Sequence, residues 1–209
     1  MMRRGRFITL EGGEGAGKST AMQTVRSWLA ARGREVIITR EPGGTDAAER
    51  IRGLLLDPES GPLTPMTELL LMFAARQENL AGVIRPALKQ GRDVVCDRFT
   101  DASRAYQGAG RQLGSDAVET LADLVHPDLR PDLTLLLDVP VAVGMERIRG
   151  RDGGPDRMEQ SRPEFLERVR QAYLAQAGLE PDRFVVIDAT RSLDDVTAAI
   201  EEALKERVN

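Results

Sequence analysis

The glycine-rich run GGEGAGKS at residues 12–19 constrains the fold of this chain more than any other stretch. It follows an apolar, β-branched segment at residues 7–10 and opens a helical pattern in which Ala21, Val25 and Trp28 share one face. The spacing matches G-x-x-x-x-G-K-[ST], a phosphate-binding loop between a strand and a helix. Glycines let successive N–H groups converge on phosphate oxygens, and the helix N-terminus adds partial positive charge. The run therefore predicts a nucleotide site in an α/β fold.

Residues of this run have different predicted roles. Lys18 is expected to neutralise the β and γ phosphates, and Ser19 to offer its hydroxyl to Mg²⁺. The residues expected to contact ATP are Gly12, Gly13, Glu14, Gly15, Ala16, Gly17, Lys18, Ser19 and Thr20. A glycine-rich turn without a ligand is the alternative interpretation. Loops of this kind occur in GTPases, motor ATPases and small-molecule kinases, so the acceptor must be inferred from other residues.

Short apolar runs alternate with longer helical patterns, which is typical of a mostly parallel sheet covered by helices. Five runs are predicted to be strands, at residues 7–10, 35–39, 93–96, 133–139 and 184–187. Helices are predicted to begin at Thr64-Pro65, Ser115, Pro163 and Ser192. No internal repeat or linker interrupts the sequence. We expect one domain over residues 1–209, an α/β three-layer sandwich with a five-stranded parallel sheet.

Composition excludes several classes of protein. No apolar run in the 209 residues approaches the roughly 18 residues of a membrane span. A net charge of −4 and only 4% aromatic residues argue against a nucleic-acid surface of basic grooves and stacking rings. The single cysteine, Cys96, excludes an internal disulfide, and the basic N-terminus leads to Glu11 instead of an apolar signal region. We therefore expect a cytoplasmic protein that binds neither nucleic acid nor membranes.

Two polar segments follow predicted strands, at residues 39–45 and 97–108. The carboxyl ends of parallel strands open onto the ligand crevice, so we expect both segments to be loops that face the nucleotide. Arginine suits a monophosphate there because its planar fork donates two parallel bonds and keeps its charge. Asp97 is placed to organise Mg²⁺ and its waters. Solvated loop ion pairs are the alternative interpretation.

The blocks REPGGT at residues 40–45, DRFTDASRAYQG at 97–108 and PDLTLLLDV at 131–139 resemble those of the thymidylate kinase family. Their spacing also resembles that of the family, and the resemblance covers nearly the whole chain. It implies a P-loop nucleoside monophosphate kinase-like fold. It also implies transfer of the ATP γ-phosphoryl group to dTMP, giving dTDP, with Mg²⁺ and usually as a homodimer.

The same resemblance implies an acceptor site. Glu14 would lie near the sugar and phosphate of dTMP, and Arg98 would grip the acceptor phosphate. Arg52 occupies the other acceptor-phosphate position of the family. Tyr106 would sit against the sugar where a ribose 2′-OH projects, which suggests how deoxyribose is preferred.

The expected base pocket departs from the family at one position. Ser103 and Gln107 would approach the base, and Arg76 matches the arginine that reads the thymine carbonyl. The family has an aromatic residue four positions before this arginine, where this chain has Met72, with Phe73 beside it. Both positions share a helix face with Arg76, and we favour Phe73 as the stacking residue. A core aromatic is the alternative interpretation of Phe73.

A basic segment at about residues 147–160 is expected to form a lid. Arg147, Arg149 and Arg151 alternate at its start. Position 14 is glutamate where some family members carry arginine, so positive charge at the γ-phosphate must come from elsewhere, as in the bacterial class with lid arginines. Arg149 or Arg151 is predicted to be an arginine finger, typically worth about 10³ or more in kcat. A solvated helix face is the alternative. The predicted catalytic residues are Glu14, Lys18, Arg98, Arg149 and Arg151.

Two other functions remain open at this stage. A kinase for another nucleoside monophosphate or for a deoxynucleoside would share the phosphate loop but have a different base pocket. A nucleotide-binding switch or regulatory module would need no small acceptor. Such a switch should contain a guanine-reading N-K-x-D element, which this sequence lacks.

Overall fold

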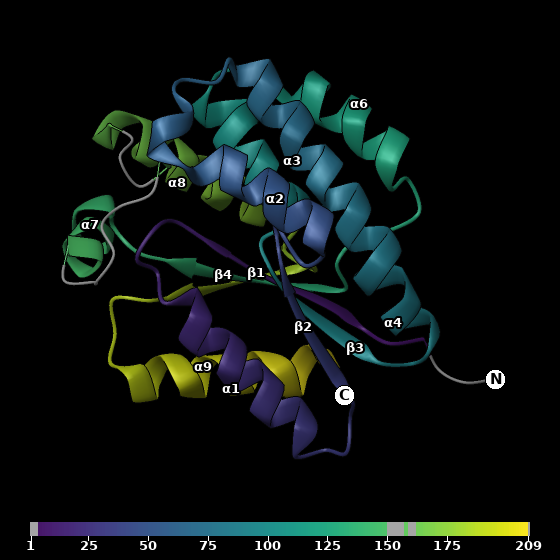
Figure 1. Cartoon of the computed structure of the whole chain (residues 1–209). Helices are drawn as coiled ribbons and strands as arrows, with labels where there is room; N and C mark the ends of the chain where they lie inside the picture. The colour runs from purple at the N-terminus through teal and green to yellow at the C-terminus, as the bar shows by residue number, and fades with distance from the viewer. Residues whose placement is uncertain (1–3, 150–156, 159–161, 209) are drawn as a thin grey trace.

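The computed structural model of the chain describes residues 4–149, 157–158 and 162–208. Within these ranges, five parallel strands form one sheet in the order β2-β3-β1-β4-β5. The strands are β1 (Phe7–Gly12), β2 (Val36–Arg40), β3 (Asp93–Asp97), β4 (Leu133–Asp138) and β5 (Phe184–Asp188). Each overlaps one of the five predicted runs, which confirms the predicted α/β fold (Figure 1).

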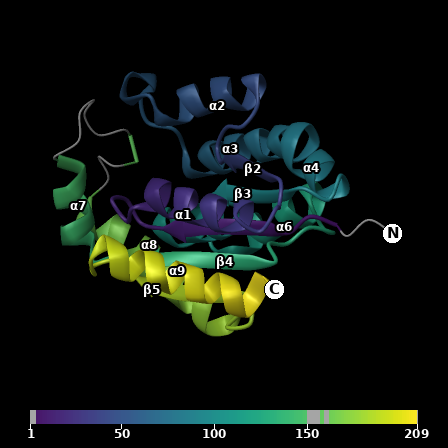
Figure 2. The same cartoon turned by 90° about the horizontal axis from the view of Figure 1, so that it is seen from below.

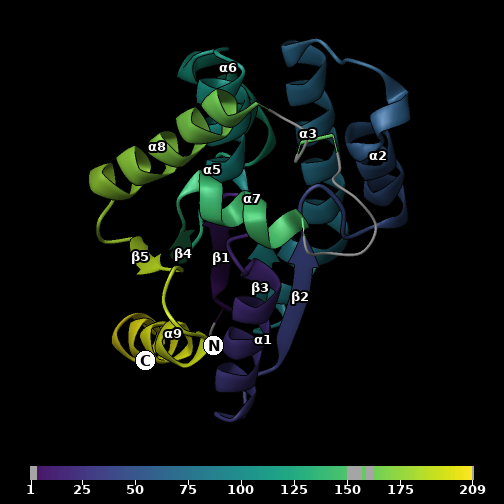
Figure 3. The same cartoon turned by 90° about the vertical axis from the view of Figure 1, so that its left-hand side faces the viewer.

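Helices cover both faces of this sheet. The helices are α1 (Lys18–Ala30), α2 (Asp46–Leu56), α3 (Pro65–Asn79), α4 (Arg85–Lys89), α5 (Thr100–Ser103), α6 (Ser115–Val125), α7 (Val141–Arg149), α8 (Pro163–Leu179) and α9 (Leu193–Val208). A 3₁₀ turn, η1 (Pro58–Ser60), and two π-helical segments, η2 (Leu80–Ile84) and η3 (Arg104–Gly110), complete the described elements. Helices α1 and α9 lie on one face (Figure 2), and α2, α3, α6 and α8 lie on the other (Figure 3). No helix in the described ranges is both long and apolar enough to cross a membrane.

Local capping explains where several helices begin. The Thr64 side chain accepts a hydrogen bond from the N–H of Thr67 at 3.3 Å, and Pro65 occupies the first turn of α3. Ser192 Oγ likewise accepts from the N–H of Asp195 at 3.2 Å, just before the first turn of α9. The predicted starts of these helices are confirmed.

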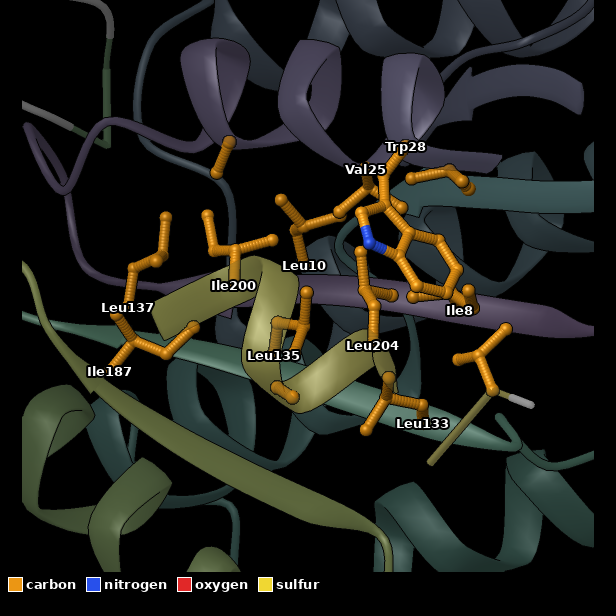
Figure 4. Close-up of a cluster of buried hydrophobic side chains, with 14 of the residues drawn as sticks. Ile8, Leu10, Val25, Trp28, Leu133, Leu135, Leu137, Ile187, Ile200 and Leu204 are labelled. Atoms are coloured by element: carbon orange, nitrogen blue, oxygen red, sulfur yellow. The ribbon is translucent and has the colours of Figure 1, made fainter. Parts of the chain in front are cut away.

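Alternation along β1 divides its side chains between the two faces of the sheet. Ile8 and Leu10 enter the apolar core beneath α1 and α9, where they meet Val25 and Leu204 (Figure 4). Glu11 has the opposite orientation and contacts α8, although it is fully buried. The strand that leads into the phosphate loop therefore carries one buried carboxylate toward the layer of α2, α3, α6 and α8.

The segment after β3 differs from its predicted loop structure. Only Arg98 and Phe99 separate β3 from a continuous helical stretch, α5 followed by η3, at residues 100–110. The buried carboxylate of Glu11 accepts a hydrogen bond from the N–H of Phe99 at 2.7 Å, at the start of this stretch. Because the stretch is helical, Ser103 and Tyr106 lie one turn apart and face the same cavity.

Candidate active site

A cavity of about 540 Å³ opens where β1, β2 and β3 end. Its walls come from the phosphate loop, the segments after β2 and β3, and helices α2, α3 and α7, together with η3 and Met158. The charged lining residues in the described ranges are Glu14, Lys18, Arg40, Glu41, Arg52, Arg76, Asp97, Arg98 and Arg147. Six of these are cations and three are carboxylates, so the cavity suits phosphate groups.

The phosphate loop curls through glycines with positive φ angles. Gly15 and Gly17 have φ angles of 69° and 87°, in the left-handed region that side chains disfavour. The ammonium group of Lys18 lies inside the curl and donates to the carbonyl oxygens of Gly12 at 3.2 Å and Gly13 at 3.0 Å. Burial lowers the pKa of Lys18, and an anion bound beside it would oppose this effect.

The loop also packs directly on helix α7. A Cβ atom at Gly15 would collide with the carbonyl oxygen of Gly144, and one at Gly144 would collide with that of Glu14. This close approach brings Arg147 to the loop, where its guanidinium group donates to the carbonyl oxygens of Gly15 at 3.4 Å and Ala189 at 2.9 Å. Helix α7 thus joins the phosphate loop to the segment after β5.

A second cavity of about 190 Å³ lies on the other side of this joint. It shares Ala16, Gly17 and Arg147 with the larger cavity and extends between α1 and α9. Val196 and Ile200 give it an apolar wall. The two cavities therefore meet at the phosphate loop; the larger has nine charged residues in the described part of its lining, and the smaller has a partly apolar wall.

Arg98 lines the larger cavity and has a strained backbone conformation. Its φ angle of 69° is unusual for a residue with a side chain, and its N–H is fixed to the carbonyl oxygen of Leu10 at 3.0 Å. Its guanidinium group donates to Glu14 Oε1 at 2.7 Å and lies 4.7 Å from the ring centre of Tyr106. The Tyr106 hydroxyl donates to the same Glu14 oxygen at 2.7 Å. Glu14, Arg98 and Tyr106 therefore meet at one point of the cavity wall.

A buried chain of hydrogen bonds connects Arg98 to α8 and β1. The Tyr173 hydroxyl, on α8, accepts from Arg98 Nη1 at 3.1 Å and donates to Glu11 Oε2 at 2.8 Å. Burial, with a smaller contribution from the charge of Asp101, raises the pKa of Glu11 to about 8. Tyr173 and Glu11 thus link the arginine to helix α8 and strand β1.

Arg76 enters the same cavity from α3 and is only 2% exposed. Its Nε donates to Glu41 Oε2 at 2.7 Å, and its Nη2 donates to Ser103 Oγ at 3.0 Å. Burial raises the pKa of Glu41, while the charge of Arg76 opposes this shift. Arg76 Nη1 is buried and has no hydrogen-bond partner among the described residues. A buried donor of this kind suits an acceptor on a ligand, such as a base carbonyl.

The residues at the end of β3 fit a magnesium ion. Asp97 Oδ1 is buried without a hydrogen-bond partner among the described residues, and Ser19 and Lys18 line the same cavity. Carboxylate and hydroxyl oxygens suit Mg²⁺, which commonly takes one or two protein ligands and completes its shell with phosphates and water. The described ranges contain no cluster of three or more metal-ligating side chains, so the protein alone offers no closed metal cage there.

Comparison with known proteins agrees with this geometry. A profile described as thymidylate kinase matches residues 10–200. The chain belongs to the thymidylate kinase family. It is 56% identical over 207 residues to the thymidylate kinase of Alkalilimnicola ehrlichii, covering 99% of this chain and 95% of that protein. It is 57% identical over 208 residues to that of Chromohalobacter salexigens, covering 99% and 98%.

A solved structure of the thymidylate kinase family has the same fold. The crystal structure of thymidylate kinase from Ehrlichia chaffeensis aligns with a TM-score of 0.78 at 33% sequence identity. The alignment covers 97% of this chain and 98% of the other. The five-stranded parallel sheet and its phosphate loop are therefore those of a thymidylate kinase.

Most of the predicted site residues line the larger cavity. These are Glu14, Gly15, Ala16, Gly17, Lys18, Ser19, Arg52, Arg76, Asp97, Arg98, Ser103 and Tyr106. Thr20 lines the smaller cavity instead. The carbonyl oxygens of Gly12 and Gly13 hold Lys18. Arg52 also donates to the carbonyl oxygen of Pro42 at 2.9 Å.

Phe73 is a correction to the predicted base pocket. It is buried away from the cavity, where it packs with Leu69, Val118 and Ala122 between α3 and α6. Met72, one position earlier on the helix, lines the cavity. Both residues share a helix face with Arg76. Helix α6 packs over Phe73 and leaves Met72 facing the cavity. Of these two side chains, Met72 is therefore the one that lines the cavity.

Gln107 and Arg149 also lie outside the lining of the larger cavity. Gln107 is fully buried; its Nε2 donates to Glu68 Oε1 at 2.8 Å, and its Oε1 has no hydrogen-bond partner among the described residues. Arg149 is exposed at the end of α7, and Arg147 is the arginine of this helix that lines the cavity. Arg151 and most of the predicted lid, residues 150–156 and 159–161, lie outside the described residues.

Several residues that shape the site are not among those predicted from the sequence. Glu41 holds Arg76, Tyr173 holds Arg98, and Met158 closes one wall of the cavity. Glu41 lies inside the REPGGT block, so the resemblance of this block to the family could have identified it. Tyr173 and Met158 act through contacts with residues far away in the sequence, and no local pattern indicates them.

Proposed function

We propose that the larger cavity holds two nucleotides with their phosphates facing each other. As a thymidylate kinase, the chain phosphorylates dTMP to dTDP with ATP as the phosphoryl donor. The observation that carries the proposed geometry is that Lys18 and Arg98, from a phosphate loop and an opposing arginine site, line one cavity with Asp97. Phosphoryl transfer needs mainly alignment and charge neutralisation, and these residues supply both.

The donor half comprises residues 12–19, Arg147 and the smaller cavity. The N–H groups of the loop and the N-terminus of α1 would bind the β and γ phosphates, with Lys18 as the neutralising charge. The adenine would extend toward residues 188–191, at the end of the smaller cavity. Arg147, already bonded to Gly15 and Ala189, would keep these two parts of the donor half together.

The acceptor half comprises Arg52, Met72, Arg76, Arg98, Ser103 and Tyr106. The dTMP phosphate would bind Arg98 and Arg52, and a phosphate on Arg98 would replace part of its present ion pair with Glu14. Arg76 Nη1 would donate to a thymine carbonyl, and Met72 would cover the base. Tyr106 would border the sugar.

Magnesium fits the junction between the two halves. Ser19 Oγ and the unpartnered Asp97 Oδ1 would hold the ion, directly or through water. When bound, Mg²⁺ neutralises charge on the β and γ phosphates. Asp97 and Ser19 themselves orient the ion from the ends of β3 and the phosphate loop.

Arg149 or Arg151 remains the proposed arginine finger of the class with lid arginines. Glu14 occupies the loop position at which an arginine would otherwise stand, so a further cation is needed at the γ-phosphate. We expect Arg149→Ala or Arg151→Ala to lower kcat by about 10³ at saturating substrates. Near-normal kcat in both variants would contradict this assignment.

We also propose that the chain forms a homodimer and acts in the cytoplasm. Leu54, Met66, Leu70 and Leu124 are exposed on the neighbouring helices α2, α3 and α6, which supports an apolar contact between two copies. Sedimentation of the purified chain tests this state. The cytoplasmic location rests on the sequence, and the buried Cys96 thiol is compatible with a reducing compartment.

An ADP-release assay with a nucleotide panel tests the function. With ATP and Mg²⁺ present, we expect the highest kcat/KM for dTMP among dTMP, dUMP, dCMP, dGMP and AMP. One methyl group separates dTMP from dUMP, so that ratio should be about 10 to 200. A preference for a purine nucleotide, or ATP hydrolysis without a phosphorylated nucleotide, would contradict the proposal.

A further inference from the structure

We propose that Glu68 is a positioning residue of the acceptor half. By binding Arg157, it fixes Met158 as a wall of the cavity in which dTMP is proposed to bind. The inference rests on the proposed function because it assigns that wall to the acceptor nucleotide. Glu68 itself does not line the cavity, so it acts through the residues that it holds.

Glu68 is fully buried in the first turn of α3, yet it serves three donors from distant parts of the chain. Gln107 Nε2 donates to its Oε1 at 2.8 Å. Arg111 donates to both carboxylate oxygens at 3.2 Å, and Arg157 Nη2 donates to Oε2 at 3.0 Å. A buried carboxylate is stable only when it is paired and hydrogen-bonded, so this arrangement specifies where its partners lie.

Arg157 is attached at three points, and among the described residues Glu68 supplies the only charged partner. Its backbone N–H donates to the carbonyl oxygen of Leu56 at 3.1 Å, and its Nε donates to that of Leu55 at 2.7 Å. These contacts join it to the end of α2, while Glu68 joins it to α3. Backbone and side chain of Arg157 are therefore both fixed.

Met158 follows directly and is 4% exposed. It belongs to the apolar cluster of Tyr106 and Phe165, with Met72 packed against it, and it lines the larger cavity. Arg111, the second arginine on Glu68, contacts the Met158 sulfur at 3.6 Å. The acceptor half therefore has a wall, Met158, whose position depends on the Glu68–Arg157 pair.

Arg157→Gln tests this dependence with little risk to folding, because Glu68 keeps Gln107 and Arg111 as partners. We expect the KM for dTMP to rise about tenfold while the KM for ATP stays within twofold of the wild-type value. Arg157→Lys keeps the charge but loses the fork, and it should recover part of this loss. Arg162→Gln removes an exposed charge five positions away and should match the wild type in both constants.

Met158→Ala and Glu68→Gln complete the test. Met158→Ala should also raise the KM for dTMP selectively, since it removes the wall itself. Glu68→Gln should do the same with a lower melting temperature, and adding Arg157→Gln to it should change the KM for dTMP by less than twofold. This lack of additivity would show that the two residues act as one unit.

Calorimetry of dTMP binding without ATP separates the two hypotheses. If the wild type binds no dTMP, the proposed function fails. If the wild type binds dTMP and Arg157→Gln binds it equally well, only the inference fails. An equal rise in both KM values, or a lower melting temperature with unchanged KM values, would also overturn the inference, because it would indicate a general structural role.

Discussion

The donor half of the cavity holds its groups with backbone, whereas the acceptor half holds them with side chains from distant elements. Lys18 is fixed by the carbonyl oxygens of Gly12 and Gly13, which lie six and five positions before it. In contrast, Arg76 depends on Glu41, 35 positions away, and Arg98 depends on Glu14, 84 positions away. A local loop can bind any nucleoside triphosphate, while long-range pairs define which acceptor fits. The variants below test this division.

Lys18→Met should have the largest effect. It removes the charge from the loop, and we expect kcat to fall by about 10³ because the charge on the transferring phosphoryl group loses its neutralisation. Stability should not fall, since burial already disfavours the charged amine and methionine has a similar length. Steady-state kinetics and thermal unfolding measure both. Lys205→Met, on an exposed part of α9, is the control.

A loss of less than tenfold for Lys18→Met would contradict the proposed role of the loop. If the variant lost both folding and activity, Lys18 would be required for the fold of the loop, and its role in catalysis would not follow.

Arg98→Lys should have the next largest effect. The variant keeps the charge but loses the fork that bonds Glu14, Gly12 and Tyr173 together. We expect kcat/KM for dTMP to fall by about 10², within the range seen when a charge-stabilising donor is removed. The KM for ATP should change little. Arg85→Lys is the control, because Arg85 makes a similar two-point pair with Asp128 on the surface.

An equal fall in kcat/KM for ATP and for dTMP would contradict the division of the cavity into a donor half and an acceptor half. If Arg98→Lys had the kinetic constants of the wild type, Arg98 would not be part of the acceptor site.

Glu11→Gln should change the pH dependence of stability. The pKa of Glu11 is raised from 4.5 to about 8 by burial, with Asp101 adding to the effect. The folded chain therefore keeps a proton that the unfolded chain releases between these pH values, and wild-type stability falls as pH rises through this window. The free energy of unfolding of Glu11→Gln minus that of the wild type should rise with a slope approaching about 1.4 kcal/mol per pH unit.

Urea unfolding of both chains from pH 4.5 to 8 measures this difference. His126, whose pKa is lowered by burial to about 4, contributes equally to both chains and cancels. A difference that does not change with pH would contradict the raised pKa of Glu11.

Tyr173→Phe should have the smallest effect of the four. It removes the hydroxyl that links Arg98 to Glu11 and leaves the ring in place. The loss of about 1 kcal/mol typical of one hydrogen bond corresponds to about a fivefold fall in kcat/KM for dTMP. Kinetics with dTMP and ATP varied separately provide the measurement. An unchanged kcat/KM for dTMP would mean that Arg98 is fixed by Glu14 and Gly12 without Tyr173.

The division into two halves also explains what the sequence could predict. The phosphate loop and the five strands are local patterns of glycine spacing and apolar runs, and they were predicted in the right places. The helix of residues 100–110 was not, because a buried carboxylate of β1 supports its start. Local polarity at this segment is the same in a loop and in a helix that faces a polar cavity.

The acceptor half was predictable in its residues and not in its packing. Arg76, Arg98 and Tyr106 were identified by resemblance, and all three line the cavity. The sequence favoured Phe73 over Met72, because both share a helix face with Arg76 and the packing of Phe73 against α6 is not visible in the sequence. The role of Glu68 depends on Arg157, 89 positions away, and no local pattern reports such a pair.

A crystal structure with dTMP and a non-hydrolysable ATP analogue would show whether the two nucleotides bind with their phosphates facing each other. The γ-phosphate is expected on the loop of residues 12–19 and the dTMP phosphate on Arg98. An acceptor oxygen should lie about 3 to 3.5 Å from the γ-phosphorus, the separation of a reactive arrangement. A dTMP phosphate that does not contact Arg98, or that lies far from Lys18, would contradict the account.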